Sequence, residues 1–563
     1  MTRKLYRSKK AWVLSCALHL GIFMAAASAV AAPWSFGVIS DTQWKGSPDG
    51  KNPNYVAVNV INHLNQEFID HGVKFVVAVG DVTQNGDILG LDTSATFRQA
   101  LYNAGIGFYP LRGNHESNQN AAGEFTRLFP QTRTGINNQT PADALIYTDY
   151  YGAPPANTSS TFTVGANFTS PSADFDGLTY SFDYDNARFI LLDQFTPPSG
   201  EPHSVLTASE VDWVGSRLAS RPPHTHAFVF GHKHLNSENH ADTLFGSDPS
   251  ANPDGLQDLF MGYLYDNGVH YYMGGHDHMH NRALITSPDG NSVVQNIVTA
   301  SDSYKFYIPR IPSNDERYNI PANGITNGPR EMEISQELFT IGYYIVTVDG
   351  PRVTVDYYAS PNGCDGDCDQ AEDLIPYTFT KHESFGYSLN GEEFLVPEGD
   401  SYAVVQDRYG RTTARILAGW NGSAGSDYAG RPFTKAVDTG WTPRTVMARR
   451  KGGDTASDIL TLWGMADLGS DRTDVYALSM SYDPATSHRK HFDKGLFALA
   501  TRDADGNWTN AVDQNFGGSK QFVRGPWRPT YGLGTYGFDP RTKTAWAVIN
   551  YNGDFAVAST DDK

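Results

Sequence analysis

Polar and ionisable side chains follow five short apolar runs in the first half of the chain. The runs end in Asp41–Gln43, Gly80–Asp81, Gly113–Glu116, Gly231–His234 and Gly275–His280. In open α/β sheets, ligands bind outside the carboxyl ends of the strands. We therefore expect these ends to gather two Asp, one Asn and several His in one crevice, as a metal site requires.

In their order along the chain, these motifs resemble the calcineurin-like metallophosphoesterases. The pattern of that family is Asp-x-His, Gly-Asp, Gly-Asn-His-Asp/Glu, a lone His and then Gly-His-x-His. A single Gly-Asp is common, but five motifs in the right order, each after an apolar run, are specific. The resemblance covers roughly residues 35–360. It implies an α/β fold, a two-sheet α/β sandwich, and a hydrolase acting on phosphoric ester bonds.

Carried over position by position, the resemblance also implies the metal ligands. The first metal would be held by Asp41, Asp81 and His278, with Gln43 as a fourth ligand. Asp81 would bridge to a second metal, whose site is completed by Asn114, His232 and His276. His115 would bind no metal and would face the leaving-group oxygen, so Asp81 and His115 are the expected catalytic residues.

The implied cofactors are two divalent metal ions, with manganese, zinc, magnesium and iron all open. Phosphate esters are inert because their anionic oxygens repel nucleophiles. Two cations neutralise those oxygens, lower the pKa of a bridging water and orient in-line attack. The resemblance thus implies attack by a metal-bridging hydroxide on a small phosphate monoester or diester.

Two positions depart from related families. Gln43 stands where the family usually has His, and its amide oxygen is a harder and weaker ligand than imidazole. Gln84 stands where purple acid phosphatases carry a Tyr ligand, so an iron(III) charge-transfer site is not expected. The spacing from Asp81 to Gly86 is more similar to small bacterial phosphodiesterases and their broad-specificity relatives.

Apolar periodicity predicts the elements that position these motifs. We expect helices over 54–72, 94–103, 209–218 and 256–265. Hairpins are expected over 180–193 and 341–358, with turns at Asp185-Asn186 and Asp349-Gly350. The first helix joins two strands in a βαβ unit with a parallel crossover. Residues 117–178 are rich in Asn, Thr, Ser, Pro and Gly, and we interpret them as an insertion over one edge of the site.

The N-terminus is typical of a targeting segment. Five basic residues precede an uncharged apolar run over 11–30, and Ala29-Val30-Ala31 is a small-x-small cleavage site. We expect residues 1–31 to be a signal peptide that is cleaved. The mature protein would then be periplasmic or extracellular and would have no membrane span. An uncleaved membrane anchor is the alternative.

Length and charge limit the organisation and the partners. The chain has 563 residues, more than one core usually supports. Loss of five basic and no acidic residues with the signal would lower the formal net charge from −19 to −24. An acidic surface repels phosphate backbones, so bulk nucleic acid is an improbable partner. The oligomeric state is not indicated.

The second half of the chain differs in composition. We assign 32–360 to the phosphoesterase domain, 361–380 to a linker and 381–563 to a mostly-β C-terminal domain of unknown role. Asn552-Gly553 is typical of a hairpin turn. Cys364 and Cys368 are expected to form a local disulfide in an exported protein, with a surface metal loop as the alternative.

A second hypothesis follows from Gln43 and from the unexplained β region. The chain would then be a cell-surface or matrix-binding protein that keeps a residual phosphoesterase fold. In that case region 380–563 binds a glycan or protein partner, and loss of Asp81 has no functional effect.

Overall fold

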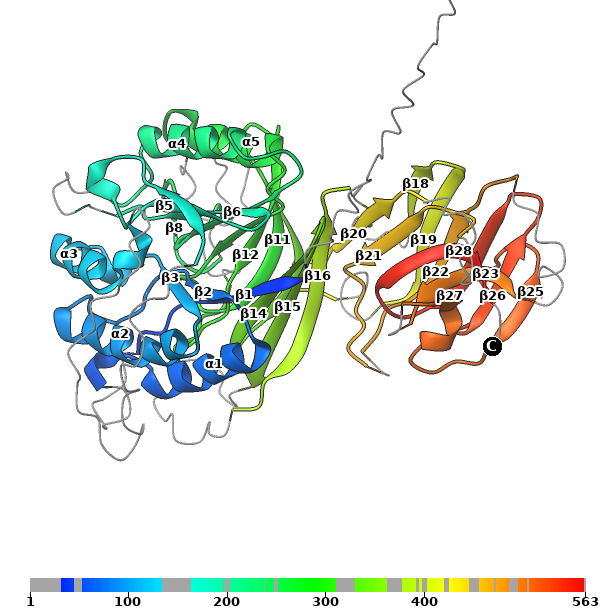
Figure 1. Ribbon diagram of the computed structural model, residues 1–563, viewed down its shortest axis with the longest axis horizontal. Coiled ribbons are helices and arrows are strands. Elements are labelled where there is room, and N and C mark those ends of the chain that lie inside the picture. The colour runs from blue at the N-terminus through cyan, green and yellow to red at the C-terminus, as the bar shows by residue number, and fades with distance from the viewer. Residues whose placement is uncertain are drawn as a thin grey trace, which may run out of the picture.

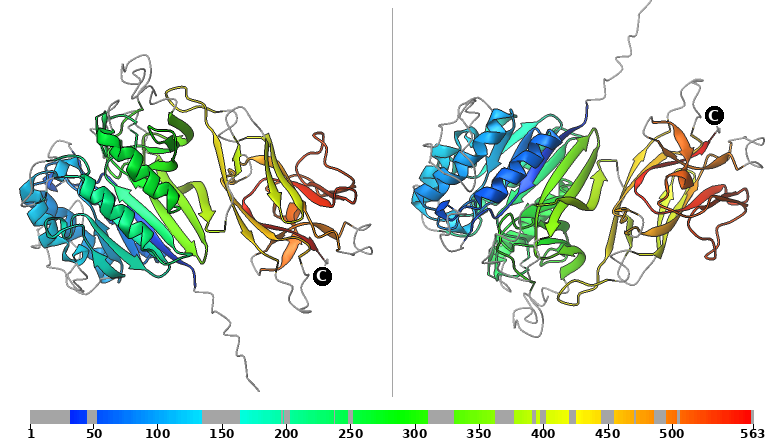
Figure 2. Two further views of the ribbon diagram at one scale, coloured as in Figure 1. Left: turned by 90° about the horizontal axis from the view of Figure 1, so that it is seen from above. Right: turned by 90° about the horizontal axis from the view of Figure 1, so that it is seen from below.

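The computed structural model describes sixteen parts of the chain, drawn as ribbons in Figures 1 and 2. They are residues 32–44, 53–133, 164–195, 197, 203–236, 238–247, 252–309, 330–361, 377–390, 394–396, 402–419, 425–444, 455–469, 472–485, 495–503 and 506–560. The predicted signal peptide and the cysteine pair lie outside the described residues. None of the helices in these parts has the length and apolarity that a membrane span needs.

A six-stranded mixed sheet carries the first three motifs. Its strand order is β16 (Thr380–Ser388), β15 (Arg352–Pro361), β14 (Thr340–Asp349), β1 (Trp34–Ile39), β2 (Phe75–Ala78) and β3 (Gly107–Pro110). Strands β1, β2 and β3 are parallel neighbours, and the other pairs are antiparallel. The carboxyl ends of β1, β2 and β3 therefore lie at one edge of this sheet.

An eight-stranded sheet carries the histidine motifs. Its order is β13 (Glu331–Glu337), β11 (His280–Thr286), β12 (Val293–Val298), β10 (Tyr271–Gly274), β7 (His226–Gly231), β6 (Ala187–Leu192), β5 (Tyr180–Tyr184) and β4 (Ala166–Thr169). Strands β12, β10, β7 and β6 are parallel. His232 follows β7 and His276 follows β10, so both lie at a shared edge of the second sheet.

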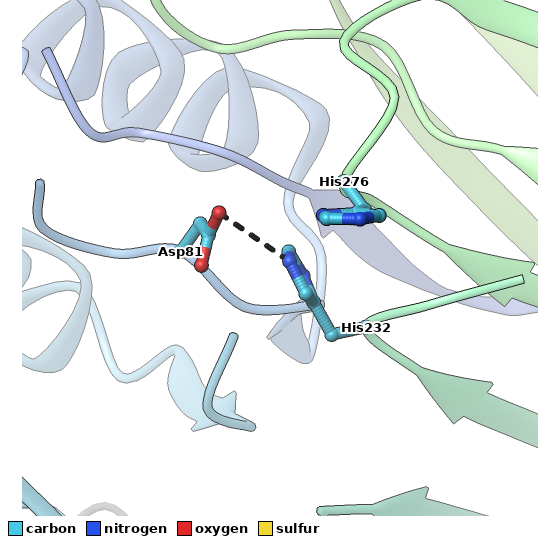
Figure 3. A group of neighbouring side chains, drawn as sticks. All are labelled: Asp81, His232 and His276. Carbon is cyan, nitrogen blue, oxygen red and sulfur yellow. Dashed lines mark ion pairs between the residues drawn. The ribbon is translucent and has the colours of Figure 1, made fainter. Parts of the chain in front are cut away.

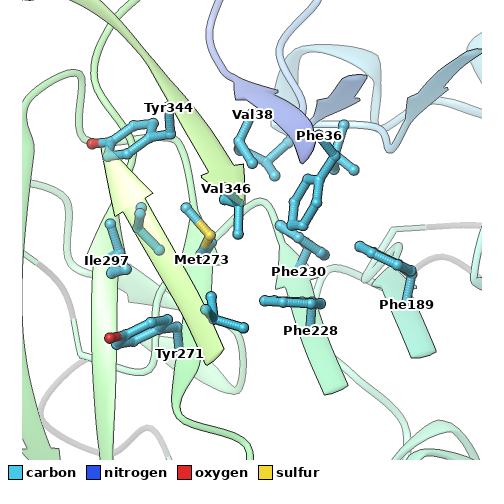
Figure 4. Close-up of a cluster of buried hydrophobic side chains, with 14 of the residues drawn as sticks. Phe36, Val38, Phe189, Phe228, Phe230, Tyr271, Met273, Ile297, Tyr344 and Val346 are labelled. Atoms are coloured by element: carbon cyan, nitrogen blue, oxygen red, sulfur yellow. The ribbon is translucent and has the colours of Figure 1, made fainter. Parts of the chain in front are cut away.

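The two sheets pack face to face over an apolar core (Figure 4). Phe36 and Val38 of β1 meet Phe228 and Phe230 of β7 there, and all four side chains are buried. Helices α1 (Val58–His71), α2 (Ile88–Asn103) and α3 (Gln119–Leu128) cover the outer face of the first sheet. Helices α4 (Ala208–Ala219) and α5 (Leu256–Asp266) cover the second. The predicted two-sheet α/β sandwich is confirmed.

Most predicted elements are present, with three corrections in the first half of the chain. The first predicted helix begins later, at Val58, after a 3-10 turn over Pro53–Tyr55, and ends at the left-handed Gly72 as expected. Helix α2 begins six residues before the predicted start, because the Asp87 carboxylate caps its first turn. Within the predicted irregular insertion, Gln119–Leu128 forms α3, whose apolar face packs in the first core.

The rest of the chain forms two further six-stranded sheets around a separate core. One has the order β17 (Phe394–Val396), β20 (Lys435–Thr442), β21 (Ile459–Trp463), β28 (Gly553–Ser559), β23 (Phe497–Arg502) and β24 (Trp508–Asn510). The other has β18 (Tyr402–Asp407), β19 (Gly410–Ala418), β22 (Val475–Ser481), β27 (Thr544–Ile549), β26 (Thr535–Asp539) and β25 (Gln521–Arg524). The expectation of a mostly-β C-terminal region is confirmed.

Two expectations about this region need correction. Asn552-Gly553 does not close a hairpin, because β27 and β28 lie in different sheets, and the Asn552 side chain instead bonds the backbone of Met465. The expected boundary at 380/381 falls at the start of β16, which pairs with β15. The first sheet therefore extends to Ser388. Strand β20 of the C-terminal sheets lies beside β16 (Figures 1 and 2).

Candidate metal centre

The structure brings all seven predicted ligands together where the two sheets meet. Asp41, Asp81 and Asn114 come from the loops after β1, β2 and β3, and the histidines come from the loops after β7 and β10. Four of the seven have left-handed backbone, with φ +54° at Asp41, +49° at Asp81, +71° at His276 and +49° at His278. Such conformations are costly for residues other than glycine and concentrate at functional sites.

Glycines in the motifs let these loops approach one another. A Cβ on Gly113 would lie 2.0 Å from Asp81 Oδ1, and one on Gly275 would lie 2.5 Å from Asp41 Oδ2. Neither glycine has a positive φ, so glycine is required at each position because there is no space for a side chain. The Gly-Asn and Gly-His pairs of the motifs are thus explained by close packing around the two carboxylates.

The first group of ligand atoms contains Asp41, Asp81 and His278, all buried. His278 Nε2 lies 3.3 Å from Asp41 Oδ1. The Gln43 amide nitrogen lies 3.1 Å from Asp81 Oδ2 and 3.2 Å from His278 Nε2, so Gln43 reaches the point where the other ligands converge. Its Oε1 is buried without a hydrogen-bond partner. Rotating this amide by 180° would turn the unpartnered oxygen toward a cation.

The second group contains Asp81, His232 and His276 (Figure 3). His232 Nε2 lies 3.3 Å from Asp81 Oδ2 and 2.9 Å from Asn114 Oδ1. The ring centroids of His232 and His276 are 5.1 Å apart. Asp81 belongs to both groups, as a residue shared by two metal ions must.

Each histidine has one ring nitrogen held by an acceptor outside the centre. His232 Nδ1 lies 2.9 Å from the carbonyl oxygen of Val79, and His278 Nδ1 lies 2.8 Å from that of Lys305. His276 Nε2 lies 3.0 Å from Asp242 Oδ1. An acceptor on one nitrogen fixes the proton there and leaves the lone pair of the other nitrogen for a metal. The residues present therefore fit a pair of divalent cations.

The electrostatics of the centre follow from its burial. Burial raises the pKa of Asp41 to about 7; His232 opposes that rise and Asp81 adds to it. For Asp81, burial alone would raise the pKa, but His232 and His115 lower it well below its usual range. Burial would lower the pKa of His232, yet Asp81 and Asp41 raise it to about 9. Burial lowers the pKa of His276 to about 4.

His115 lies beside the ligand groups and retains access to solvent. Its Nε2 is 3.7 Å from Asp81 Oδ2, and its side chain is 19% exposed. Its Nδ1 lies 2.5 Å from the carbonyl oxygen of Gln84, which leaves Nε2 pointing toward the centre. When the ring also carries a proton on Nε2, a donor held this way can reach a leaving-group oxygen at the mouth of the site.

Some residues around the centre were not found from the sequence. Asp242 holds His276 and also pairs with Lys233 at 2.7 Å, although it lies ten residues after His232 with no motif around it. Asp277 is fully buried and accepts hydrogen bonds from the backbone of 238–240. Arg112 forms a buried salt bridge, with its Nε 2.6 Å from Asp193 Oδ2.

Comparisons with known proteins agree with this geometry. Residues 35–280 match the family model for calcineurin-like phosphoesterases. The predicted resemblance to this family is confirmed for this part of the chain. A search of curated proteins found no significant match.

Three solved structures show similarity at low identity. GAP50, the anchor in the inner membrane complex of Plasmodium, is 16% identical, with 62% of this chain and 88% of that chain covered and a TM-score of 0.33. Purple acid phosphatase PPD1 from seeds of yellow lupin (Lupinus luteus) is 12% identical, with 63% and 54% covered and a TM-score of 0.34. A dimetal phosphatase from Danio rerio is 15% identical, with 57% and 95% covered and a TM-score of 0.30.

Proposed function

We propose that this protein is an exported phosphoesterase that requires two divalent metal ions. The observation that carries the proposal is the shared position of Asp81 between two groups of ligand atoms. Asp41, Gln43 and His278 would complete one metal site, and Asn114, His232 and His276 the other. When bound, the cations would supply the positive charge that neutralises phosphate oxygens and acidifies the attacking water.

The residues of the chain have distinct roles in this proposal. The carboxylates of Asp41 and Asp81 are buried away from water, so a divalent cation is the favoured partner for their negative charge. His115 donates a proton or a hydrogen bond from Nε2 to the leaving-group oxygen. The Gln84 carbonyl orients the His115 ring from the opposite side.

The substrate is a small phosphate monoester or diester. The acidic chain, with a formal net charge of −19, disfavours long phosphate backbones. Export rests on the N-terminal signal sequence, and the division into a phosphoesterase domain and a C-terminal β domain rests on their separate cores. Gln43 in place of His favours manganese or magnesium over zinc, because its amide oxygen is a hard ligand.

The test uses the chain from Ala32 onward, stripped of metal and resupplied with manganese, zinc, magnesium or iron. Hydrolysis of a chromogenic phosphodiester is compared with that of the matching monoester. Asn114→Ala should abolish the metal-dependent rate. Asn103→Ala, at the exposed last residue of α2, should retain it. A folded protein without hydrolysis under any metal would contradict the proposal.

A further inference from the structure

A single arginine of the C-terminal region enters a carboxylate cluster of the phosphoesterase domain. Arg431 Nη2 lies 2.7 Å from Glu238 Oε2, and its Nη1 lies 2.7 Å from Glu331 Oε2. The same Nη1 is 2.9 Å from Glu333 Oε1, and Arg431 Nε is 2.6 Å from Asp427. The guanidinium thus joins the segment before β20 to β13 and to the loop that contains Glu238.

The cluster contains four carboxyl groups and one guanidinium, and burial raises the pKa of Glu333 to about 8. Glu238, Glu331 and Glu333 are buried, and their ligand atoms lie within 4.8 Å of one another, close enough for a cation. In this structure the Arg431 guanidinium takes that place, with its side chain 12% exposed. Removal of one partner from a buried ion pair is strongly destabilising, so this contact couples the two parts of the chain.

Glu238 connects this cluster to the metal centre through Asp277. The backbone nitrogens of Glu238, Asn239 and His240 donate to the Asp277 carboxylate at 2.9, 3.1 and 3.0 Å. Asp277 lies between His276 and His278 in the last motif. Because these nitrogens hold the Asp277 carboxylate, the position of residues 238–240 also fixes Asp277 and its two histidine neighbours.

Residues of the same loop contact the second-site ligand His276 directly. The His240 ring pairs with Asp277 at 2.7 Å and stacks on the His276 ring with centroids 4.1 Å apart. Asp242, two residues further on, holds His276 Nε2. His276 is thus oriented by a loop that is anchored at Glu238 by the C-terminal region.

We propose that Arg431 is a positioning residue for the metal centre, acting through Glu238 and the 238–242 loop on His276. The inference rests on the proposed function, because it concerns the second of the two metal sites. It assigns the C-terminal β region a role in completing that site. The link from this loop to the first group is less direct: the Tyr307 ring contacts both His240 and His278, with centroids 4.8 and 5.1 Å apart.

The experiment titrates the metal-stripped full chain with Mn²⁺ and counts bound ions by electron paramagnetic resonance. The variants are Arg431→Met and Glu238→Gln, compared with the unchanged chain. Glu238→Gln keeps the size of the side chain, removes one carboxyl group from the cluster and replaces the ion pair with Arg431 by a neutral contact. The matched control is Arg352→Met, which breaks another arginine contact between the domains, 3.0 Å from Asp554.

We expect the unchanged chain to bind two Mn²⁺ and the test variants to bind one of them about 10-fold more weakly, as for other groups that orient metal ligands. Arg352→Met should bind both ions as the unchanged chain does. Equal affinities in the unchanged chain and in folded Glu238→Gln would overturn the inference. Absence of Mn²⁺ binding by the unchanged chain would instead contradict the proposed function on which it rests.

Discussion

Backbone conformation and side-chain chemistry coincide at the residues of the metal centre. Asp41, Asp81, His276 and His278 all have left-handed backbone, and the neighbouring motif glycines leave no room for a methyl group. The motif spacing predicted that the seven candidate ligands lie together, because each follows a strand end. Asp242 and the stacking of His240 were not predictable, since a loop brings them to His276 and no local pattern marks them.

Gly275→Ala tests the close packing at this scale. The added carbon would lie 1.9 Å from Ser40 Oγ and 2.5 Å from Asp41 Oδ2, so Asp41 has to move. We expect at least a ~10-fold loss of metal-dependent hydrolysis, because a displacement near 1 Å at a reacting centre has effects of that order or larger. Gly262→Ala in α5, whose nearest contact is 4.0 Å away, is the control and should keep full activity.

His226 gives the protein a defined response to acid. Its buried ring lies 2.9 Å from the Gly350 carbonyl oxygen and 3.1 Å from the Tyr387 hydroxyl, and burial lowers its pKa from 6.5 to about 4. The unfolded chain therefore binds a proton between these values that the folded chain excludes. Stability from this group is complete above pH 6.5 and is lost as the pH falls to about 4, by roughly 3 kcal/mol.

Urea unfolding on both sides of this pH window measures the effect. His226→Gln should show a smaller loss of unfolding free energy on acidification than the unchanged protein. His224→Gln alters an exposed histidine two residues earlier and should retain the full loss. An identical pH response in all three proteins would show that His226 does not titrate as described.

Strand direction explains how distant motifs become one site. Parallel β1, β2 and β3 end at one edge, as do β7 and β10, and the Phe36–Phe230 core holds these edges together. Alternation and apolar runs predicted these strands well. The predicted start of α2 was too late, because the first turn is marked by the Asp87 cap and not by the apolar periodicity of the later turns. Asn552-Gly553 was misjudged because its turn chemistry suits a hairpin but cannot report which sheet each strand joins.

Asp87→Ala tests the capping of α2, the helix that follows the Asp81 loop. The Asp87 carboxylate accepts a hydrogen bond from the Gly90 nitrogen at 2.7 Å. Its loss should lower the unfolding free energy by about 1 kcal/mol in urea titration, the usual cost of a lost N-cap. Asp87→Asn keeps a capping oxygen and should retain most of this stability. An equal loss in both variants would show that the charge of Asp87, and not its capping oxygen, stabilises the helix.

On the scale of the whole molecule, two cores are joined across an interface that combines polar contacts with a small apolar cluster of Leu284, Ile334 and Ala436. Arg431 contacts Glu238, Glu331 and Glu333, and Trp463 Nε1 donates to Thr354 Oγ1 at 3.1 Å. Arg352 pairs with Asp554 at the same interface. The sequence showed a compositional change between the regions, but it could not show this docking, because the paired charges are up to two hundred residues apart.

Calorimetry of the metal-stripped chain should therefore show a single unfolding transition. Breaking both arginine contacts in Arg352→Met/Arg431→Met should separate it into two transitions, because a buried and a partly exposed ion pair that couple the cores are lost. The double control Arg127→Met/Arg133→Met removes half-exposed arginine contacts inside the first domain and should keep one transition. Two transitions in the unchanged chain would contradict coupling between the cores.

The most direct test of the two-metal centre is a stoichiometric titration of the metal-stripped chain with Mn²⁺ while phosphate-ester hydrolysis is followed. If Asp81 is shared by two sites, the hydrolysis rate should reach its maximum near two equivalents per chain, and Asn114→Ala should stay inactive throughout. A rate that is maximal at one equivalent, or hydrolysis that persists without metal, would contradict the two-metal centre.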